Sequence, residues 1–136
     1  MVRSAVRGSG VCVRGAALPL VGMVTTISFQ ELTLRVEACE SAQTGADLWP
    51  ASTGLCHWLF AHQQLLHGRR VLELGCGLAL PSLLLTACGA GVADALATDE
   101  SQTLVDHVTH NAELNNVRLS ARRLDFTSRD EVYSSP

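Results

Sequence analysis

The stretch from Arg70 to Pro81, RVLELGCGLALP, constrains the fold of this chain more than any other segment. A short apolar run stops at Gly75-Cys76-Gly77, and a second apolar run opens at Pro81. Glycine permits a sharp turn and a close approach of the backbone to a ligand, and proline favours the first turn of a helix. The stretch therefore predicts a buried strand, a glycine turn and a helix whose free N–H groups face the turn.

Two classes of cofactor are bound at a strand, glycine turn and helix, and the spacing of the small residues separates them. The dinucleotide pattern Gly-x-Gly-x-x-Gly/Ala requires a small residue where this chain has Leu80, which disfavours a dehydrogenase. The pattern Glu/Asp-x-Gly-x-Gly-x-Gly is typical of methyltransferases that use S-adenosylmethionine. It fits Glu73, Gly75 and Gly77, with Ala79 in place of the third glycine.

A second segment carries an acidic residue at the end of another predicted strand. Residues 92–97 predict that strand, and Thr98-Asp99-Glu100 follows it. An acid at the end of the second strand, about 20 residues after the glycine turn, can accept hydrogen bonds from both hydroxyls of a ribose. The alternative is that Asp99 or Glu100 caps the next helix, a common role of aspartate. The two signals at this separation favour contact with a cofactor.

The apolar patterns of the remaining chain predict alternating strands and helices. Residues 25–36 have β character with a change of parity near Gln30-Glu31, which indicates a hairpin or a bulge. The helices and the third strand are predicted at 51–67, 81–88, 101–114 and 117–121. A hairpin and a helix followed by β-α-β-α-β indicate an α/β fold whose parallel strands bind a ligand at their carboxyl ends.

Composition limits the class of protein and the domain count. The 136 residues allow one domain at most, and a composition of 47% hydrophobic and 17% charged residues favours a buried core. We divide the chain into an unassigned leader at 1–22, a partial cofactor-binding domain at 23–126 and a polar tail at 127–136. The leader is expected to be disordered or to act in targeting. The net charge of −3 gives no reason to expect nucleic acid or an anionic membrane as a partner.

The leader and the cysteines bear on the compartment. The first 30 residues contain three arginines and no acid, as in a mitochondrial or plastid transit peptide or in an extension upstream of Met23. Five cysteines, never two residues apart, disfavour a disulfide framework and a zinc knuckle. We expect a cytoplasmic location, or an organelle if the leader is a transit peptide. The histidines show no spacing that gathers three metal ligands.

With these residues in place, the chain resembles the lysine methyltransferase-like group of class I methyltransferases (methyltransferase family 16). The resemblance covers residues 25–126, and its blocks are TGADLWPAS at 44–52, LELGCG with LP at 72–81, CGA at 88–90, TD at 98–99 and the helix end at 111–116. It implies a Rossmann-like fold of which this chain holds the N-terminal half. The group continues with a fourth strand, whose absence leaves the glycine-turn strand as an apolar edge.

The resemblance also implies S-adenosylmethionine as cofactor and a set of residues that bind it. Trp49 would lie against the cofactor, or is a core or hinge aromatic. Gly75 to Gly77 would cradle the methionine part, and Asp99 would hold the ribose. Phe126 stands where the group has a tryptophan beside the adenine, and still offers a ring for stacking. The candidate cofactor-binding residues are Trp49, Glu73, Gly75, Cys76, Gly77, Asp99 and Phe126.

The implied function is methyl transfer to a protein, with lysine as the expected target and with much of the substrate side missing from this chain. A lysine amine must lose its proton, and no residue is assigned as the base. Asp125 is expected to be a turn residue, and Cys76 has no catalytic role because it lacks a base partner. The alternative is a non-catalytic half-domain that binds cofactor weakly or pairs with a partner, or with itself, through the open sheet edge.

Overall fold

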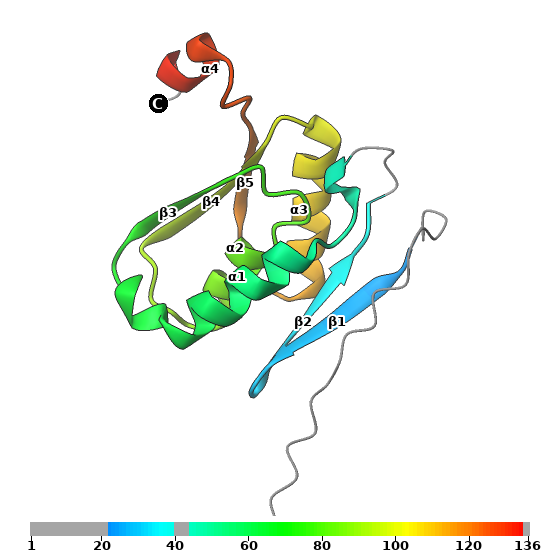
Figure 1. Ribbon diagram of the computed structural model, residues 1–136, viewed down its shortest axis with the longest axis vertical. Coiled ribbons are helices and arrows are strands. Elements are labelled where there is room, and N and C mark those ends of the chain that lie inside the picture. The colour runs from blue at the N-terminus through cyan, green and yellow to red at the C-terminus, as the bar shows by residue number, and fades with distance from the viewer. Residues whose placement is uncertain (1–21, 40–43, 135–136) are drawn as a thin grey trace, which may run out of the picture.

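The computed structural model describes residues 22–39 and 44–134 (Figure 1). Of the leader predicted at 1–22, only Gly22 is among them. The elements in chain order are β1 (Val24–Phe29), β2 (Leu32–Glu37), the 3-10 turn η1 (Thr44–Ala46), α1 (Pro50–Ala61), the 3-10 turn η2 (Gln63–Leu65), β3 (Arg70–Leu74), α2 (Leu80–Ala87), β4 (Asp94–Asp99), α3 (Gln102–Leu114), β5 (Ser120–Arg123) and α4 (Arg129–Ser134). No helix in the described part of the chain is long and apolar enough to cross a membrane.

Strands β1 and β2 form the predicted hairpin as a separate two-stranded antiparallel sheet. The chain reverses at Gln30, which adopts a left-handed φ of 52°. Phe29, Leu34 and Val36 are buried and join the main core, which also contains the buried leucines of α2. The change of side-chain parity in the sequence therefore marks the turn of the hairpin.

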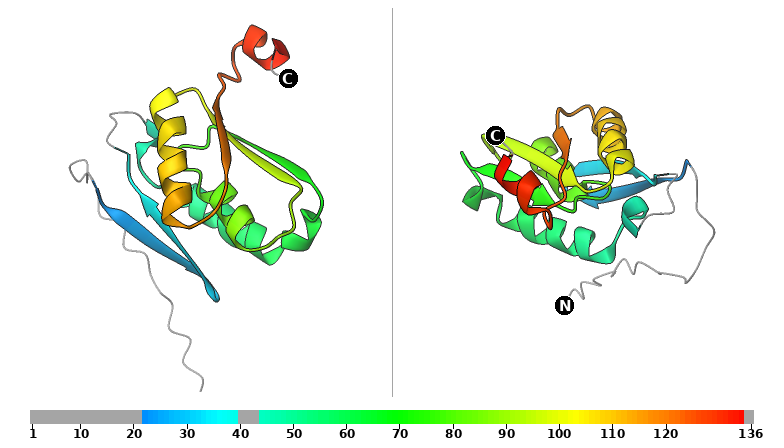
Figure 2. Two further views of the ribbon diagram at one scale, coloured as in Figure 1. Left: turned by 180° about the vertical axis from the view of Figure 1, so that it is seen from behind. Right: turned by 90° about the horizontal axis from the view of Figure 1, so that it is seen from above.

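The second sheet is parallel, in the order β3-β4-β5, and confirms the predicted α/β fold (Figures 1 and 2). Right-handed crossovers place α2 and α3 on the same face of such a sheet. Ala95 and Ala97 of β4 are buried, and α2 and α3 both contact this strand. The carboxyl ends of β3 and β4 lie together, since Leu74 pairs with Thr98.

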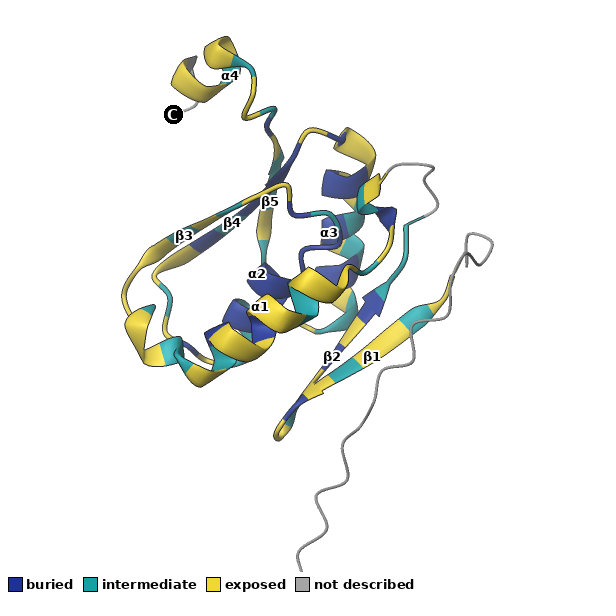
Figure 3. Ribbon diagram, viewed as in Figure 1, coloured by how far each residue is buried: buried dark blue, intermediate teal, exposed yellow. Residues whose placement is uncertain are grey.

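The prediction that residues 71–74 form a buried strand is wrong for one face of β3. Leu72 and Leu74 remain 54% and 50% exposed. Figure 3 shows that parts of β3 are exposed. Among the described residues β3 pairs only with β4, so it is the edge of its sheet. Its apolar residues therefore lie at an open edge, as the resemblance implied, and alternate strand positions leave the two leucines on the uncovered face.

Several element boundaries differ from the prediction because helix ends adopt local conformations that periodicity does not encode. The helix predicted at 51–67 ends at Ala61, and His62 has a φ of −120° before η2 begins. The strand predicted at 117–121 begins at Ser120, since Asn116 adopts a left-handed φ of 55° and the Val117 N–H still bonds to Ala112 of α3.

The polar tail predicted at 127–136 contains the short helix α4. Glu131 holds this helix against the end of β5. One of its carboxylate oxygens accepts a bond of 2.8 Å from Arg123, and the other accepts the Asp125 N–H at 2.9 Å.

The strand predicted at 92–97 is found two residues later, as β4, so that Asp99 is its last residue.

Asn111 of α3 and Asn115, which follows the end of this helix, bind the open edge of β2. The Oδ1 atom of Asn111 accepts the Glu37 N–H at 2.9 Å, and its Nδ2 donates to the Glu37 carbonyl at 3.3 Å. Asn115 makes the same pair of bonds with Arg35, at 2.8 and 2.6 Å. Because each amide matches both polar groups of a strand residue, the hairpin is fixed to the helix that follows Asp99.

Replacing Asn111 with alanine is expected to lower the free energy of unfolding by about 2–3 kcal/mol, because Asn111 is fully buried and its loss removes both bonds to Glu37 and leaves the Glu37 N–H without a partner. Urea denaturation followed by circular dichroism measures the change. Thr109→Ala, at an exposed position of the same helix, is the control and is expected to change stability by less than about 0.5 kcal/mol. Equal effects of the two substitutions would contradict the role of Asn111.

Candidate cofactor-binding site

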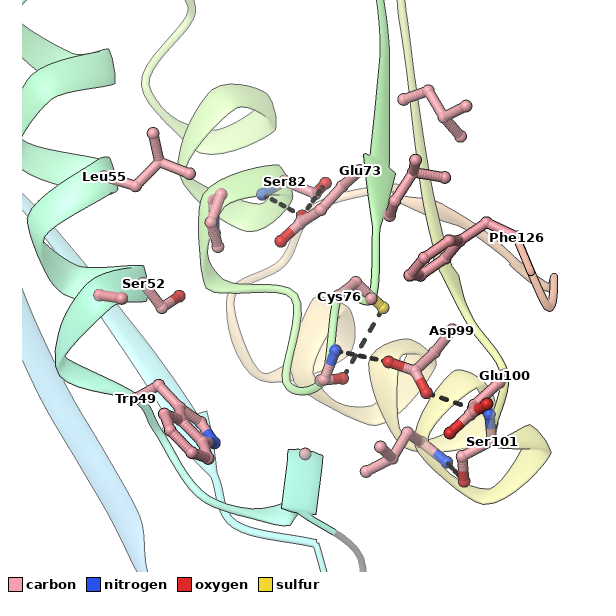
Figure 4. A pocket seen from close by; sticks show the side chains of 18 of the residues that line it. Trp49, Ser52, Leu55, Glu73, Cys76, Ser82, Asp99, Glu100, Ser101 and Phe126 are labelled. Atoms are coloured by element: carbon pink, nitrogen blue, oxygen red, sulfur yellow. Dashed lines mark hydrogen bonds between the residues drawn. The ribbon is translucent and has the colours of Figure 1, made fainter.

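A cavity of about 970 Å³ opens at the carboxyl ends of β3 and β4 (Figure 4). Its walls come from η1, the first turns of α1, the glycine turn, the start of α2 and the loop after β5. All seven candidate residues line it, namely Trp49, Glu73, Gly75, Cys76, Gly77, Asp99 and Phe126. The structure thus brings the predicted set together, while the contact of each residue with a cofactor stays a prediction.

The glycine turn requires left-handed backbone at three alternate positions. Gly75 and Gly77 have φ values of 62° and 51°, and Ala79 has 58°. A side chain at Gly77 would also be crowded, because a Cβ there would lie 3.0 Å from the carbonyl oxygen of Gly45. Gly45 belongs to η1, so this segment packs directly on the turn. The family resemblance placed Gly45 in the TGADLWPAS block at 44–52 without giving it this role.

Asp99 binds the glycine turn from the neighbouring strand. Its Oδ2 accepts the Gly77 N–H at 3.0 Å, and its Oδ1 accepts the Ser101 N–H at 3.0 Å. The side chain that caps α3 is Ser101, whose Oγ accepts the Leu104 N–H at 3.3 Å. Asp99 is therefore not the helix cap considered as its alternative role, and its buried carboxylate lies at the wall of the cavity.

Glu73 and Cys76 lie in the same wall of the cavity. Glu73 cannot act as a free base there, and Cys76 cannot act as a nucleophile. The Oε2 atom of Glu73 accepts both the N–H and the hydroxyl of Ser82, the N–H at 3.0 Å. Burial raises the pKa of Glu73, and the charge of Asp99 adds to this, whereas the bonds from Ser82 oppose it. Burial and the charges of Glu73 and Asp99 raise the pKa of Cys76 to about 12. The Cys76 thiol therefore stays protonated at neutral pH.

Replacing Glu73 with glutamine is expected to raise the melting temperature at pH 8, because the buried charge opposes folding. A carboxyl whose pKa is higher in the folded chain stabilises the fold below its unfolded pKa, near 4.5, and this contribution is lost as the pH rises through the folded pKa. The advantage of the glutamine variant should therefore shrink as the pH falls from 8 towards 4.5. Thermal unfolding across this range tests it, with the exposed Glu31→Gln as control. A pH-independent difference would contradict the prediction.

Two exposed aromatic rings flank the cavity. Trp49 is 53% exposed, which excludes a core position, and its indole N–H donates to the Thr44 carbonyl at 2.8 Å. Phe126 is 54% exposed and lies beside Gly75, since a Cβ on that glycine would be 4.0 Å from its ring.

Asp125 forms the expected turn by accepting two bonds from Thr127, which lower the pKa of Asp125.

The cavity is acidic. Five of its lining residues carry carboxyl groups, and no Lys, Arg or His is found among the described residues that line it. Such a surface favours cationic ligands. No three His, Cys, Asp or Glu side chains in the described ranges could together hold a metal ion. The carboxyl-bearing residues are Asp47, Glu73, Asp99, Glu100 and Asp125.

Known proteins share parts of this sequence. The chain is 39% identical to rat histone-arginine methyltransferase METTL23 over 61 residues, which are 45% of this chain and 27% of the rat protein. The mouse protein is 33% identical over 88 residues (63% of this chain and 34% of that protein), and the Xenopus laevis protein 30% identical over 88 residues (65% and 37%). The matched segments thus amount to no more than 37% of these relatives.

Solved structures share the fold. A Streptococcus mutans protein assigned to the SAM-dependent methyltransferases superposes with a TM-score of 0.57 at 15% identity, over 85% of this chain and 29% of that one. The Pyrococcus abyssi tRNA (uracil-54, C5)-methyltransferase, in complex with S-adenosyl-L-homocysteine, gives 0.50 at 13% identity, over 75% and 24%. The Rossmann-like methyltransferase fold is therefore confirmed. The family model described as lysine methyltransferase matches residues 28–132, and the chain belongs to that family.

Proposed function

We propose that this chain forms the cofactor-binding part of a methyltransferase that transfers a methyl group from S-adenosylmethionine to a protein side chain. The observation that carries the proposal is the meeting of the glycine turn with the acid of the next strand. The Gly77 N–H and the Asp99 carboxylate are 3.0 Å apart at the wall of one cavity. Family membership and the names of the relatives support methyl transfer to a protein.

The lining of the cavity suits this cofactor in charge and in the kinds of side chain that it offers. S-adenosylmethionine carries a sulfonium and an ammonium group, which suit a wall with five carboxyl groups. When bound, it supplies a methyl group on an excellent leaving group. Gly75 and Gly77, which carry no side chain, allow a ligand close to the backbone, and Asp99 can accept ribose hydroxyls through its remaining lone pairs. Trp49 and Phe126 offer ring surfaces for the adenine.

We propose lysine as the target side chain, in line with the description of the family. Arginine is the second candidate, because the relatives are named as histone-arginine methyltransferases. Asp47 and Glu100 are exposed carboxylates at the cavity and would attract either cation. A lysine amine must still become neutral before it attacks, which nearby carboxylates oppose and desolvation favours.

The experiment first measures binding of S-adenosylmethionine to the full chain by calorimetry and then tests methyl transfer. Two peptides that differ only by Lys or Arg at one position receive tritiated cofactor. The chain itself contains no lysine, so methyl-lysine in the hydrolysate reports on the peptide alone. Saturable binding with labelled lysine supports the proposal, and labelled arginine supports the second target. Absence of cofactor binding would refute it.

The alternative function is a non-catalytic half-domain that pairs through the edge of β3. The half-exposed Leu72 and Leu74 favour it. Sedimentation across concentrations tests this, with Leu72→Glu as the variant expected to remove self-association.

We also propose a cytoplasmic location, with mitochondria or plastids as the alternative. Microscopy of the chain fused at its C-terminus to a fluorescent protein distinguishes these compartments.

A further inference from the structure

The carboxyl group of Glu73 is bound to the start of helix α2. The close view shows it turned towards Ser82 at the start of α2 (Figure 4). Both bonds from Ser82, from its N–H at 3.0 Å and from its hydroxyl, end on Oε2. Among the described residues, no hydrogen bond reaches Oε1. Glu73 therefore uses one oxygen to hold the first turn of the helix.

Helix α2 needs an acceptor from outside because its own cap residue cannot provide one. Ala79 precedes the helix and has no polar side chain, so the N–H of Ser82, the third helical residue, has no local side-chain partner. Glu73, nine positions earlier in the chain, supplies the acceptor across the glycine turn. A single carboxyl group thus joins the end of β3 to the start of α2.

The turn is fixed on its other side by β4. The Thr98 hydroxyl donates to the Glu73 carbonyl at 2.7 Å, and the Cys76 N–H donates to the Thr98 carbonyl at 2.9 Å. The left-handed backbone of the turn is unfavourable for Ala79 in particular, so the turn needs outside support to keep its shape. The Glu73 side chain and the Thr98 bonds provide this support from both ends.

We infer that Glu73 is a positioning residue, which shapes the cofactor cavity by holding Ser82 and α2 and does not touch the cofactor. This inference rests on the proposed function and refines the prediction that listed Glu73 among the contacts. Its consequence is that the acceptor oxygen is required whereas the negative charge is not. A direct contact with the sulfonium or ammonium group would instead require the charge.

Two substitutions separate these requirements. Glu73→Gln keeps an acceptor oxygen for Ser82 and removes the charge, because only Oε2 is used. Glu73→Ala removes both. Binding of S-adenosylmethionine, measured by calorimetry, is expected to weaken by no more than about threefold in the glutamine variant and by about tenfold or more in the alanine variant, a loss of about 1.4 kcal/mol. Glu113→Ala, at an exposed position of α3, is the matched control.

A double variant tests whether Glu73 acts through its partner. Ser82→Ala removes the hydroxyl, and we expect the losses in Glu73→Ala and Ser82→Ala to overlap, so that the double variant binds within about twofold of Glu73→Ala. Losses that multiply would contradict action through Ser82. Equal losses in Glu73→Gln and Glu73→Ala would overturn the inference and show that the charge contacts the cofactor. Unchanged affinity in Glu73→Ala would also overturn it.

Amide hydrogen exchange in the ligand-free chain gives a second measurement that does not depend on the proposed function. Peptides covering residues 77–82 are expected to exchange faster in Glu73→Ala than in Glu73→Gln and in the unmodified chain. If the unmodified chain binds no cofactor, the proposed function fails, and exchange alone decides whether Glu73 holds α2. Equal exchange in all three proteins would overturn the inference.

Discussion

Replacing Gly77 with alanine is expected to abolish detectable cofactor binding and to lower the free energy of unfolding by about 3 kcal/mol. Gly77 has a left-handed φ of 51°, and an added Cβ would lie 3.0 Å from the Gly45 carbonyl oxygen and 3.5 Å from its Cα. Backbone atoms cannot yield as a side-chain tip can. We therefore expect η1 to move away from the turn, and the bond from the Gly77 N–H to Asp99 to be lost.

Gly89→Ala is the matched control for this prediction. Gly89 follows α2 with a similar φ of 67°, and a Cβ there would meet no atom within 4 Å. The control therefore measures backbone strain alone, expected at about 1–2 kcal/mol. Urea denaturation and calorimetry with S-adenosylmethionine measure both variants. Equal destabilisation with cofactor binding retained in Gly77→Ala would show that packing against Gly45 does not shape the site.

The parts of the site predicted from sequence are those that local chemistry determines. The spacing of Gly75 and Gly77 after an apolar run specifies a turn that only small residues can adopt, so strand, turn and helix could be predicted. Asp99 could be predicted because parallel strands end at the same edge of a sheet. The hairpin could be predicted because parity changes at Gln30 where the chain reverses.

The parts that were missed depend on contacts between distant segments. Gly45 touches Gly77 across 32 positions, and nothing in the residues near Gly45 indicates that neighbour. Glu73 matched a cofactor motif, but only the structure shows its carboxyl group bound to Ser82. The exposure of Leu72 and Leu74 follows from sheet order, which apolar periodicity does not reveal, since a buried strand and an open edge have the same pattern.

Replacing Asp99 with alanine is expected to weaken binding of S-adenosylmethionine about 100-fold, equivalent to about 2.7 kcal/mol. The substitution leaves the N–H groups of Gly77 and Ser101 without their acceptor, and hydrogen bonds to a charged group contribute about 1.5–3 kcal/mol each. Calorimetry measures the affinity at a temperature where circular dichroism shows the variant folded. Asp94→Ala, at the exposed first residue of the same strand, is the control and is expected to bind as the unmodified chain does.

Asparagine at position 99 is expected to be nearly as harmful as alanine, in contrast to glutamine at Glu73. Both oxygens of Asp99 accept an N–H, so an asparagine amide must direct its own NH₂ group at a donor, whichever way it is turned. Glu73 uses a single oxygen, and its amide can be placed without such a conflict. Cofactor affinity in Asp99→Asn equal to that of the unmodified chain would contradict this difference, because it would show that the bonds to Gly77 and Ser101 do not form the site.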